Sequence, residues 1–495
     1  MDVAAGAYPS GFRLVLDEDT HRPSPRTLIG GSPVRLVRLS DVGSRLVDSW
    51  LSGAPVGPRR AAQMLARRLV DAGIAQPQPP SDAGPGPDEV TVVVPVRDRP
   101  SGLAETLAAL NGLNVVVVDD ASLEPVVLTG REVIRREVIR RELPGGPAAA
   151  RDTGWRSAAS PVVVFLDADC VPGQGWLTRL LAHFADARVG AVAPRVRPAP
   201  GGGLLTRYER AVSPLDMGAR TAAVGPGTRV PYVPTACLAV RTSALEASGG
   251  FDEDLRFGED VDLVWRLIAA GWSVRYEPRA AVWHPPRAGI PAMIRQRFDY
   301  GRSAAPLALR HGSDTAPLAV SVWGAGAWAL AAFGRVVPAT GLVAVASAVA
   351  ARRVATDGPS RRAVAALAAR GNLATGKWIA TAVRRAWVPP LLLMLCCAPR
   401  SLRRRAASWL VVSFLWPAVD WLIPPAGTTR PEMGLLAWTA LRWMDDLAYQ
   451  AGVWTGALQQ RSARALLPKL RARASARPQG QAAATVSSSA SPVSR

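Results

Sequence analysis

Two aspartates directly follow an apolar run about a third of the way along this 495-residue chain. Residues 162–166 predict a buried strand, and Asp167 and Asp169 come next with one alanine between them. A buried carboxylate is costly without a compensating charge, so a bound cation would account for both groups. Hard oxygen ligands suit Mg²⁺ or Mn²⁺, ions that also bind substrate diphosphates. We therefore predict a metal site that stabilises a diphosphate leaving group, with a solvated turn as the alternative interpretation.

A second acidic pair, Asp119 and Asp120, ends another apolar run in the same way. These carboxylates predict hydrogen bonds from an imide N–H, as on uracil, or from ribose hydroxyls. An Asx turn or a helix N-cap is the alternative. Residues 144–151 form a glycine-rich start to a helix, whose N-terminal amides and Arg151 are candidates to contact a phosphate or the nucleotide.

A third acidic cluster, Glu259, Asp260 and Asp262, begins a predicted amphipathic helix. Acids in a first helical turn ordinarily complement the helix dipole. Here they follow a glycine loop, which favours a general base that takes the proton of an attacking acceptor hydroxyl. We assign that role to Asp260 and expect Glu259 to position the acceptor or cap the helix. His284, at the end of a further apolar run, is a candidate third metal ligand, although a lone histidine is more often a packed or surface residue.

Short apolar strands alternate with helices over residues 90–312 and must position these clusters. Strands are predicted at residues 90–95, 115–118, 138–139 and 162–166. This pattern is typical of an α/β fold with a mostly parallel sheet covered by helices on both faces. Ligands of such sheets bind outside the carboxyl ends of the strands, which is where both acidic pairs lie.

The rest of the chain divides by composition. Residues 1–75 combine short β-like runs with two amphipathic helices and predict a small α+β domain. Residues 76–89 are rich in proline and glycine and predict a linker. Residues 461–495 are basic, then rich in alanine and serine, and predict a disordered tail.

Residues 313–460 alternate apolar segments with arginine clusters at 352–353, 384–385 and 403–405. This pattern predicts a helical region associated with a membrane, and an alanine-rich soluble helical domain is the alternative. From residue 310 to the end, 23 Lys and Arg stand against 6 Asp and Glu, so most of the net charge of +20 lies here. Basic residues interleaved with apolar segments fit anionic lipid headgroups, and no nucleic-acid partner is expected.

The cellular compartment follows from the cysteines and the N-terminus. The four cysteines form no CxxC pair, which argues against a disulfide framework or a zinc site and favours a reducing cytoplasm. Residues 1–25 lack a continuous apolar segment and contain three acidic residues in succession, so no secretory signal is expected. We place the catalytic part on the cytoplasmic face of the cell membrane.

In this order along the chain, the motifs resemble a family 2 glycosyltransferase of the GT-A fold, over residues 90–312. The resemblance rests on residues 92–95, Asp119-Asp120, residues 145–151, Asp167-Ala-Asp169, Gly249-Gly-Phe251 and Glu259-Asp260. It implies an inverting, metal-dependent transfer from a nucleotide sugar. The nucleotide-sugar-binding residues would be Pro95, Asp119, Asp120, Arg151 and Asp167. The metal ligands would be Asp167 and Asp169, to which the strand pattern adds His284 as a candidate, and Asp260 would be the base.

A closer likeness is to the glycosyltransferases of the mycofactocin system. It rests on residues 94–100 (VPVRDRP), residues 144–154 (PGGPAAARDTG) and the apolar C-terminal region. The N-terminal unit resembles small peptide-recognition domains of peptide-modifying pathways. These likenesses imply that glucose from UDP-glucose is added, as a β-linked chain, to a peptide-derived redox cofactor precursor. The sequence departs from the family pattern at two places. Asp152 stands where we expect asparagine, and residues 296–302 only loosely resemble the Q-x-x-R-W element of processive members.

Two other functions are compatible with the sequence. The apolar C-terminal third favours an acceptor that is a membrane lipid or a cell-envelope glycan. A non-catalytic membrane scaffold for peptide-processing enzymes is the other, and the presence of Asp167, Asp169 and Asp260 argues against it. The Asp167-Ala-Asp169 chemistry would also suit a nucleotidyltransferase, but such an enzyme would need a fuller phosphate-binding loop than this sequence supplies.

Overall fold

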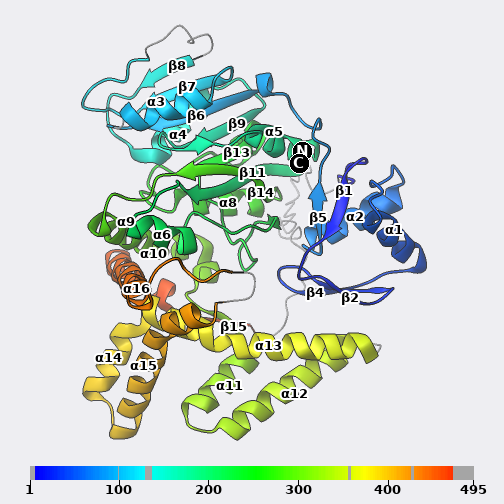
Figure 1. Cartoon of the computed structure of the whole chain (residues 1–495), viewed down its shortest axis with the longest axis vertical. Helices are drawn as coiled ribbons and strands as arrows, with labels where there is room; N and C mark the ends of the chain where they lie inside the picture. The colour runs from blue at the N-terminus through cyan, green and yellow to red at the C-terminus, as the bar shows by residue number, and fades with distance from the viewer. Residues whose placement is uncertain (1–5, 99, 129–135, 355–357, 425–427, 472–495) are drawn as a thin grey trace, which may run out of the picture.

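The computed structural model describes residues 6–98, 100–128, 136–354, 358–424 and 428–471. Its architecture has three parts: a small N-terminal domain, a large sheet with helices on both faces, and a helical C-terminal region (Figure 1). The α/β prediction for the middle of the chain is confirmed.

The N-terminal domain combines two small sheets with two helices. Its elements are β1 (Arg13–Leu16), β2 (His21–Ser24), β3 (Thr27–Gly30), β4 (Arg35–Arg38), α1 (Asp41–Leu51), α2 (Arg60–Asp71) and β5 (Ala75–Gln78). The helix α1 begins after Ser40, whose side chain accepts a hydrogen bond from the Gly43 amide. Aromatic and aliphatic side chains such as Phe12, Trp50 and Leu69 fill its core.

The predicted linker is wrong at its start, because residues 76–78 belong to β5 and pair antiparallel with β1. This pairing satisfies backbone groups of β1 that would otherwise lack partners. Proline is tolerated there because an edge strand leaves some N–H positions free.

Buried ion pairs fasten the N-terminal domain to the large sheet. Arg67 makes two hydrogen bonds of 2.7 and 2.8 Å to the Asp186 carboxylate. Arg229 donates to Asp17 at 2.7 and 3.0 Å. Removing one partner of a buried pair leaves an uncompensated charge, so the two parts depend on one another.

The large sheet has the strand order β10-β14-β11-β13-β9-β6-β7-β8, with β12 paired to β14. Its strands are β6 (Val90–Val96), β7 (Asn114–Asp119), β8 (Arg136–Arg140), β9 (Val162–Leu166), β10 (Val171–Pro172), β11 (Val189–Pro198), β12 (Ala222–Ala223), β13 (Cys237–Arg241) and β14 (Ser273–His284). The strands β8, β7, β6 and β9 are parallel, whereas β13 runs antiparallel between β9 and β11. The sheet is therefore mixed, not mostly parallel as predicted.

Helices cover both faces of this sheet. On one face lie α3 (Pro100–Ala109) and α5 (Trp176–Leu181), and on the other α4 (Gly146–Ser157), α7 (Thr242–Ser248) and α8 (Glu259–Ala269). Alternate residues of each strand enter the two cores, so that Val92 and Val94 face α3 while Val93 faces α4. The helix α6 (Leu204–Val212) and the short 3₁₀ segments η2 (Pro87–Glu89) and η3 (Ala182–Ala185) complete this part.

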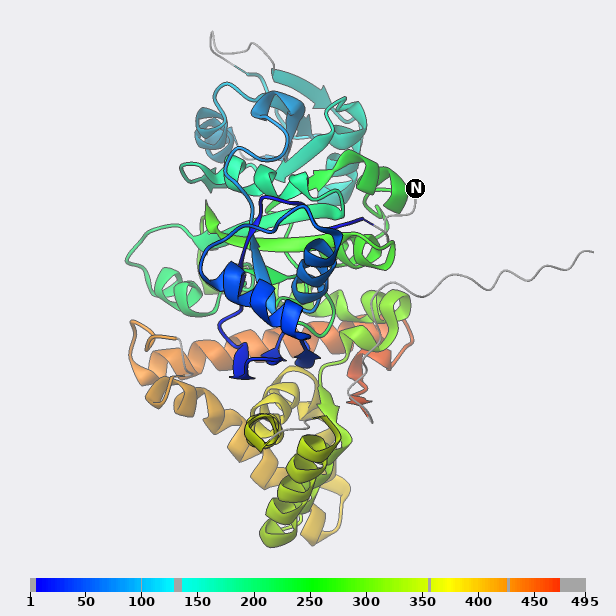
Figure 2. The ribbon, with the colours of Figure 1, turned by 90° about the vertical axis from the view of Figure 1, so that its right-hand side faces the viewer.

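The C-terminal region is almost entirely helical. Its elements are α9 (Ile290–Arg302), α10 (Ala304–His311), η4 (Gly312–Thr315), β15 (Ala319–Ser321), α11 (Val322–Ala332), α12 (Val336–Val354), α13 (Gly358–Ala382), the π-helical η5 (Val383–Trp387), α14 (Val388–Cys397), α15 (Arg400–Leu422), α16 (Leu435–Gln459), η6 (Arg464–Leu466) and β16 (Lys469–Arg471). In both ribbon views α16 lies between the sheet and the helices α11–α15, which form the far end of the molecule (Figures 1 and 2).

The helices α9 and α16 cross in backbone contact. A Cβ atom on Gly301 would lie 2.0 Å from the Tyr449 carbonyl oxygen, and one on Gly452 would lie 2.0 Å from the Phe298 carbonyl oxygen. Glycines at both positions therefore let α16 pack directly against α9, the first helix after the last strand of the large sheet.

The prediction of a disordered tail is wrong for its first residues. The strand β16 pairs parallel with β15, and η6 precedes it. Lys469 also forms an ion pair with Asp314 at 2.7 Å, so this basic residue has a charged partner in the fold. Residues 472–495 lie outside the described part of the chain.

Candidate active site

The three predicted metal ligands lie together at the carboxyl ends of two strands. Asp167 and Asp169 follow β9, and His284 is the last residue of β14. One ligand atom from each residue falls in a group within 4.8 Å of one another. His284 Nε2 lies 3.5 Å from Asp169 Oδ1. Two carboxylates and an imidazole fit a divalent cation, and the carboxylates favour Mg²⁺ or Mn²⁺.

A tight turn holds the aspartates at this position. The Asp167 amide donates to the Ala236 carbonyl at the start of β13, and the Cys170 amide donates to the Asp167 carbonyl, both at 3.0 Å. The Cys170 side chain is buried beneath this turn, where burial and the nearby Asp167 raise the pKa of its thiol. Cys170 is therefore a packing residue, and the carboxylates of the turn stay the predicted metal ligands.

Arg151 connects the metal ligands to the third acidic cluster. It lies buried in α4, where it donates to Asp167 Oδ1 at 2.7 Å and to Glu259 Oε1 at 2.9 Å. The prediction placed Arg151 beside a phosphate, and the structure places its guanidinium between two carboxylates. Its contact with the nucleotide stays a prediction, and its observed contacts fix α8 relative to β9.

Asp260 occupies the first turn of α8, directly after Glu259. Burial, together with the negative charge of Glu259, raises the pKa of Asp260 to about 7. A carboxylate with a pKa near neutrality can accept a proton from an attacking hydroxyl, since general bases work best near the operating pH. The geometry is compatible with the predicted role, which stays a prediction.

Asp119 and Asp120, at the end of β7, accept hydrogen bonds from backbone amides of the neighbouring segments. Asp119 accepts from the Ser122 amide at 2.9 Å, the Val126 amide at 3.1 Å and Arg140 at 2.7 Å. Burial alone would raise the pKa of Asp119, but these hydrogen bonds lower it below its ordinary value. The bond from the Ser122 amide, three residues on, is a local side-chain-to-backbone contact like the Asx turn or cap of the alternative interpretation, although an Asx turn would use the amide two residues on. A contact with the nucleoside stays a prediction for both residues.

Asp120 binds the start of α4. It accepts hydrogen bonds from the amides of Gly145 and Gly146 at 2.9 and 2.7 Å. These are the helix N-terminal amides that the sequence suggested for a phosphate, so the structure gives them an internal partner instead. Pro95 lies nearby in β6, half-buried and opposite Val118 in the register with β7.

Asp152, the departure from the family pattern, was missed as a site residue. It accepts from the Phe251 amide at 3.0 Å and from Trp155 Nε1 at 2.6 Å. Gly250 has a positive φ of +77°, and a Cβ there would lie 2.2 Å from Asp152 Oδ1. Asp152 therefore fixes the glycine loop that leads to Asp260, a role that the spacing of the Gly-Gly-Phe motif could not indicate.

Two tyrosines interact electrostatically with Asp260. Burial and the neighbouring Asp260 raise the pKa of Tyr300, in α9, to about 12. The same two causes raise the pKa of Tyr232, whose hydroxyl also interacts electrostatically with Tyr449 and Arg385. The Arg385 guanidinium lies over the Tyr449 ring, 3.9 Å from its centroid. The helical region thus contributes side chains near Asp260.

The arginine pair at residues 384–385 was predicted among the membrane-facing clusters, and the structure corrects this. Arg384 is 2% exposed and donates to Asp446 at 2.7 Å, while Arg385 Nε lies 3.6 Å from the same carboxylate. The cause is α16, whose consecutive acids Asp445 and Asp446 attract arginines from two directions. Arg297 of α9 is the second partner, 3.1 Å from Asp445.

This chain is similar to known proteins of one enzyme family. The model of glycosyl transferase family 2 matches residues 91–249. The pre-mycofactocin glycosyltransferase of Mycobacterium tuberculosis is 41% identical over 486 residues, which cover 95% of this chain and 100% of that protein. The glycosyltransferase AglE of Haloferax volcanii is 27% identical over 225 residues, which cover 43% of this chain and 72% of that protein.

Solved structures were also compared. The mannosyltransferase PcManGT from Pyrobaculum calidifontis, in complex with GDP-Man and Mn²⁺, is 19% identical, with 76% of this chain and 91% of that chain covered and a TM-score of 0.40. GalNAc-T7 with UDP, GalNAc and Mn²⁺ is 17% identical, with 43% and 47% covered and a TM-score of 0.31. The predicted family, GT-A fold and enzyme class are confirmed. The chain is a glycosyltransferase and belongs to family 2, in the same family as the pre-mycofactocin glycosyltransferases.

Proposed function

We propose that this enzyme transfers glucose from UDP-glucose to pre-mycofactocin, a peptide-derived redox cofactor precursor, with inversion at the anomeric carbon. Repeated transfer would build a β-linked oligoglucose chain. The observation that carries the proposal is the approach of two groups of side chains: the metal ligands Asp167, Asp169 and His284, and the base Asp260, joined through Arg151 and Glu259. Similarity to the M. tuberculosis protein over its whole length supports the acceptor.

The reaction is a single displacement. A hydroxyl of the acceptor attacks the anomeric carbon of glucose, and its proton passes to the Asp260 carboxylate as the new C–O bond forms. The bond from that carbon to the diphosphate oxygen breaks, and UDP leaves with the electron pair. When bound, Mg²⁺ or Mn²⁺ would supply positive charge to the diphosphate at Asp167, Asp169 and His284.

Arg151 and Glu259 position the reacting groups. The Arg151 guanidinium holds the Asp167 carboxylate on one side and Glu259 on the other, so the donor half and the base half of the site move together. Such alignment is a large part of catalysis, because reacting atoms must approach to within about 3–3.5 Å.

We further propose that the enzyme works at the cytoplasmic face of the membrane. Two helices, Val336–Arg353 and Pro359–Cys397, are long and apolar enough to cross a membrane by length and composition. Their most apolar windows are 22% and 33% buried, which is low for the core helix of a soluble protein.

The test is a matrix of donors and acceptors read by mass spectrometry. The purified full chain with Mn²⁺ is given UDP-glucose or other nucleotide sugars, each with pre-mycofactocin, a lipid or a glycan acceptor. Hexose-sized additions to pre-mycofactocin from UDP-glucose are expected, and the Asp260→Asn variant serves as the inactive control. Turnover of the lipid or glycan acceptor without turnover of pre-mycofactocin would overturn the acceptor.

A further inference from the structure

We propose that the helical region holds one acyl chain of an anionic phospholipid in an apolar pocket between its helices and the β15–β16 pair. This proposal rests on the membrane association proposed above. It adds a ligand site, made by α11, α13, η5, α15 and the β15–β16 pair, to which none of the predicted donor, metal or base residues belongs.

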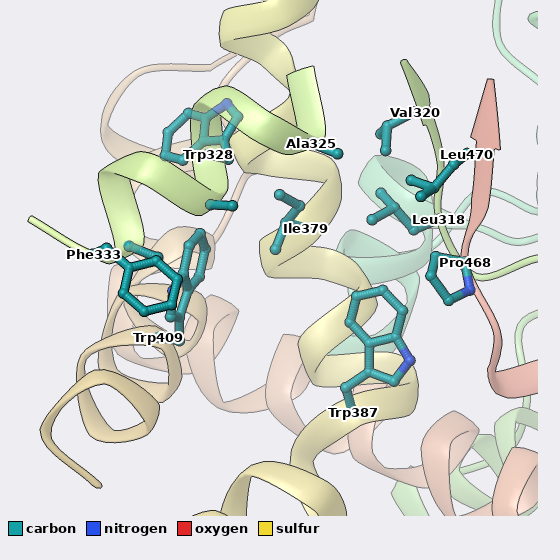
Figure 3. A pocket seen from close by; sticks show the side chains of 12 residues that line it. Leu318, Val320, Ala325, Trp328, Phe333, Ile379, Trp387, Trp409, Pro468 and Leu470 are labelled. Atoms are coloured by element: carbon teal, nitrogen blue, oxygen red, sulfur yellow. The ribbon is translucent and has the colours of Figure 1, made fainter. Parts of the chain in front are cut away.

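The pocket has a volume of about 370 Å³, within the range of about 300–1,000 Å³ that is common for ligand sites. Its lining is apolar throughout: Leu318, Val320, Ala325, Trp328, Ala329, Ala332, Phe333, Ile379, Trp387, Trp409, Pro468 and Leu470. Figure 3 shows these side chains converging from the helices on one side and from the strand pair on the other.

Two of the three tryptophans that line this pocket donate their indole N–H groups to backbone carbonyls of the fold. Trp328 Nε1 donates to the Asn372 carbonyl at 2.9 Å, and Trp387 Nε1 donates to the Leu466 carbonyl at 2.8 Å. The indole N–H groups are therefore satisfied within the fold, and the rings offer carbon surface to the pocket. Water binds poorly in a space without two to four polar partners, whereas a hydrocarbon chain gains about 0.8 kcal/mol for each buried CH₂.

The surroundings of the pocket indicate where such a chain would come from. Phe333 lines the pocket and is 54% exposed, and Val336 and Val337 follow it at the start of α12 with still greater exposure. Large apolar side chains are also exposed on α14 and α15, among them Leu393, Val411 and Leu415. Figures 1 and 2 show that these helices lie at the end of the molecule away from the sheet. An exposed apolar surface of this kind marks a contact with a membrane or another protein.

Charge favours an anionic lipid over a neutral one and over an apolar protein surface. The Arg405 guanidinium lies over the Phe333 ring, 4.1 Å from its centroid, and so stands beside the pocket. Residues 316–419 contain 13 Arg and Lys and one acidic residue, Asp357. Three of these cations already have acidic partners, Arg384 and Arg385 with Asp446 and Lys377 with Asp420, and without them ten remain. Each basic residue near a membrane that contains anionic lipid contributes about 1 kcal/mol of attraction. An acyl chain in the pocket would place its phosphate near Arg405.

The test measures lipid that stays with the protein. The full chain and its variants are incubated with vesicles of phosphatidylcholine alone or mixed with phosphatidylglycerol, extracted with mild detergent, and analysed by native mass spectrometry. We expect about one retained phospholipid per chain, several-fold enriched in phosphatidylglycerol. Ala329→Phe fills the pocket and should reduce retention at least five-fold, and Arg405→Gln should keep the lipid but remove the enrichment.

Two matched controls keep the result interpretable. Val337→Phe adds the same ring outside the pocket, where the side chain is 82% exposed, and should retain lipid like the wild type. Ala332→Leu is a milder filling variant in case Ala329→Phe alters the helical circular dichroism. Equal retention by the wild type and both folded filling variants would overturn the pocket.

Failure of the lipid pocket can be distinguished from failure of the proposed membrane association and of the proposed glucosyl transfer. Vesicle flotation of every variant measures membrane association, and glucosyl transfer to a soluble acceptor measures activity. A wild type that floats with vesicles but retains no lipid contradicts the pocket alone. A wild type that does not float contradicts the membrane association on which the pocket depends.

Discussion

The Asp260→Asn variant should lose activity and gain stability at the same time. As the proposed general base, Asp260 takes the acceptor proton, and loss of such a group typically costs about 10²–10⁴-fold in rate. The amide cannot accept that proton, but it has nearly the size of the carboxyl group. The stability gain follows because burial and the charge of Glu259 disfavour the ionised carboxylate in the folded protein.

The size and sign of the stability effect follow from the pKa of Asp260. It rises from an ordinary 3.8 to about 7. At about 1.4 kcal/mol per unit, three units set a ceiling of about 4 kcal/mol. Because the carboxylate is half-buried, we expect about 2 kcal/mol. The folded protein binds the proton more tightly, so ionisation costs stability in full above pH 7, and this cost fades as the pH falls towards 3.8.

Thermal unfolding of the wild type and Asp260→Asn at pH 8 and pH 5 checks this prediction. The variant should unfold at a higher temperature at pH 8, and its advantage should shrink at pH 5. Asp262→Asn is the matched control, since that carboxylate is paired with Arg266 and His311 and its removal should destabilise the fold. An Asp260→Asn variant that is less stable than the wild type at pH 8, or that keeps full activity, would refute the reasoning.

Four other predictions follow from the same geometry. Asp169→Asn should lower turnover more than 10²-fold and weaken Mn²⁺-dependent UDP binding in calorimetry, with His284→Ala showing a smaller loss. The wild-type kcat/KM should rise with pH through about 7, as Asp260 ionises. Asp446→Asn should lower the free energy of unfolding, measured in urea, by about 3–5 kcal/mol, because it leaves the buried Arg384 without its charged partner. Arg385→Ala should raise the KM for the acceptor and leave that for UDP-glucose unchanged, since Arg385 lies on the base side.

Each of these predictions has an outcome that contradicts it. Metal-dependent UDP binding that is unaltered in Asp169→Asn would remove that residue from the metal site. A pH profile that is flat between 5 and 9 would argue against Asp260 as the titrating base. Unchanged urea stability of Asp446→Asn would show that Arg384 is adequately solvated, and equal changes in both KM values would place Arg385 outside the acceptor side.

The acidic clusters could be found from the sequence because they interrupt apolar strands. A carboxylate directly after a five-residue apolar run is conspicuous, and parallel strands bring such ends to one edge of the sheet. For that reason Asp167, Asp169 and His284, far apart in the chain, were predicted as one site and lie together. A different signal, a glycine loop followed by acids at the start of an amphipathic pattern, placed Asp260 in the first turn of a helix.

Strand direction and pairing could not be predicted in the same way. A short apolar strand buried on both faces has the same composition whichever way it runs, so β13 gave no sign that it is antiparallel. The strands β5 and β16 consist of proline-rich or basic residues, and only their partners β1 and β15 make them strands. Tertiary pairing decided these elements against local propensity.

The roles of the arginines depended on contacts distant in sequence. Arg384 and Arg403 occur in similar basic clusters, but Asp446 of α16 lies only beside the former. Arg151 likewise sits in a segment that predicts phosphate binding, while its carboxylate partners come from β9 and α8. The sequence predicted that these arginines bind anionic groups, and the fold determined that their partners are carboxylates of the same chain.

The most direct test of the proposed reaction is the stereochemistry of its first product. The full chain, UDP-glucose, pre-mycofactocin and Mn²⁺ are combined, and the anomeric proton of the monoglucosylated product is observed by NMR before the chain extends. Single displacement with Asp260 as base predicts a β-glucoside from the α-linked donor, formed only when the divalent ion is present. An α-glucoside, or a product formed equally well in chelator, would contradict the account.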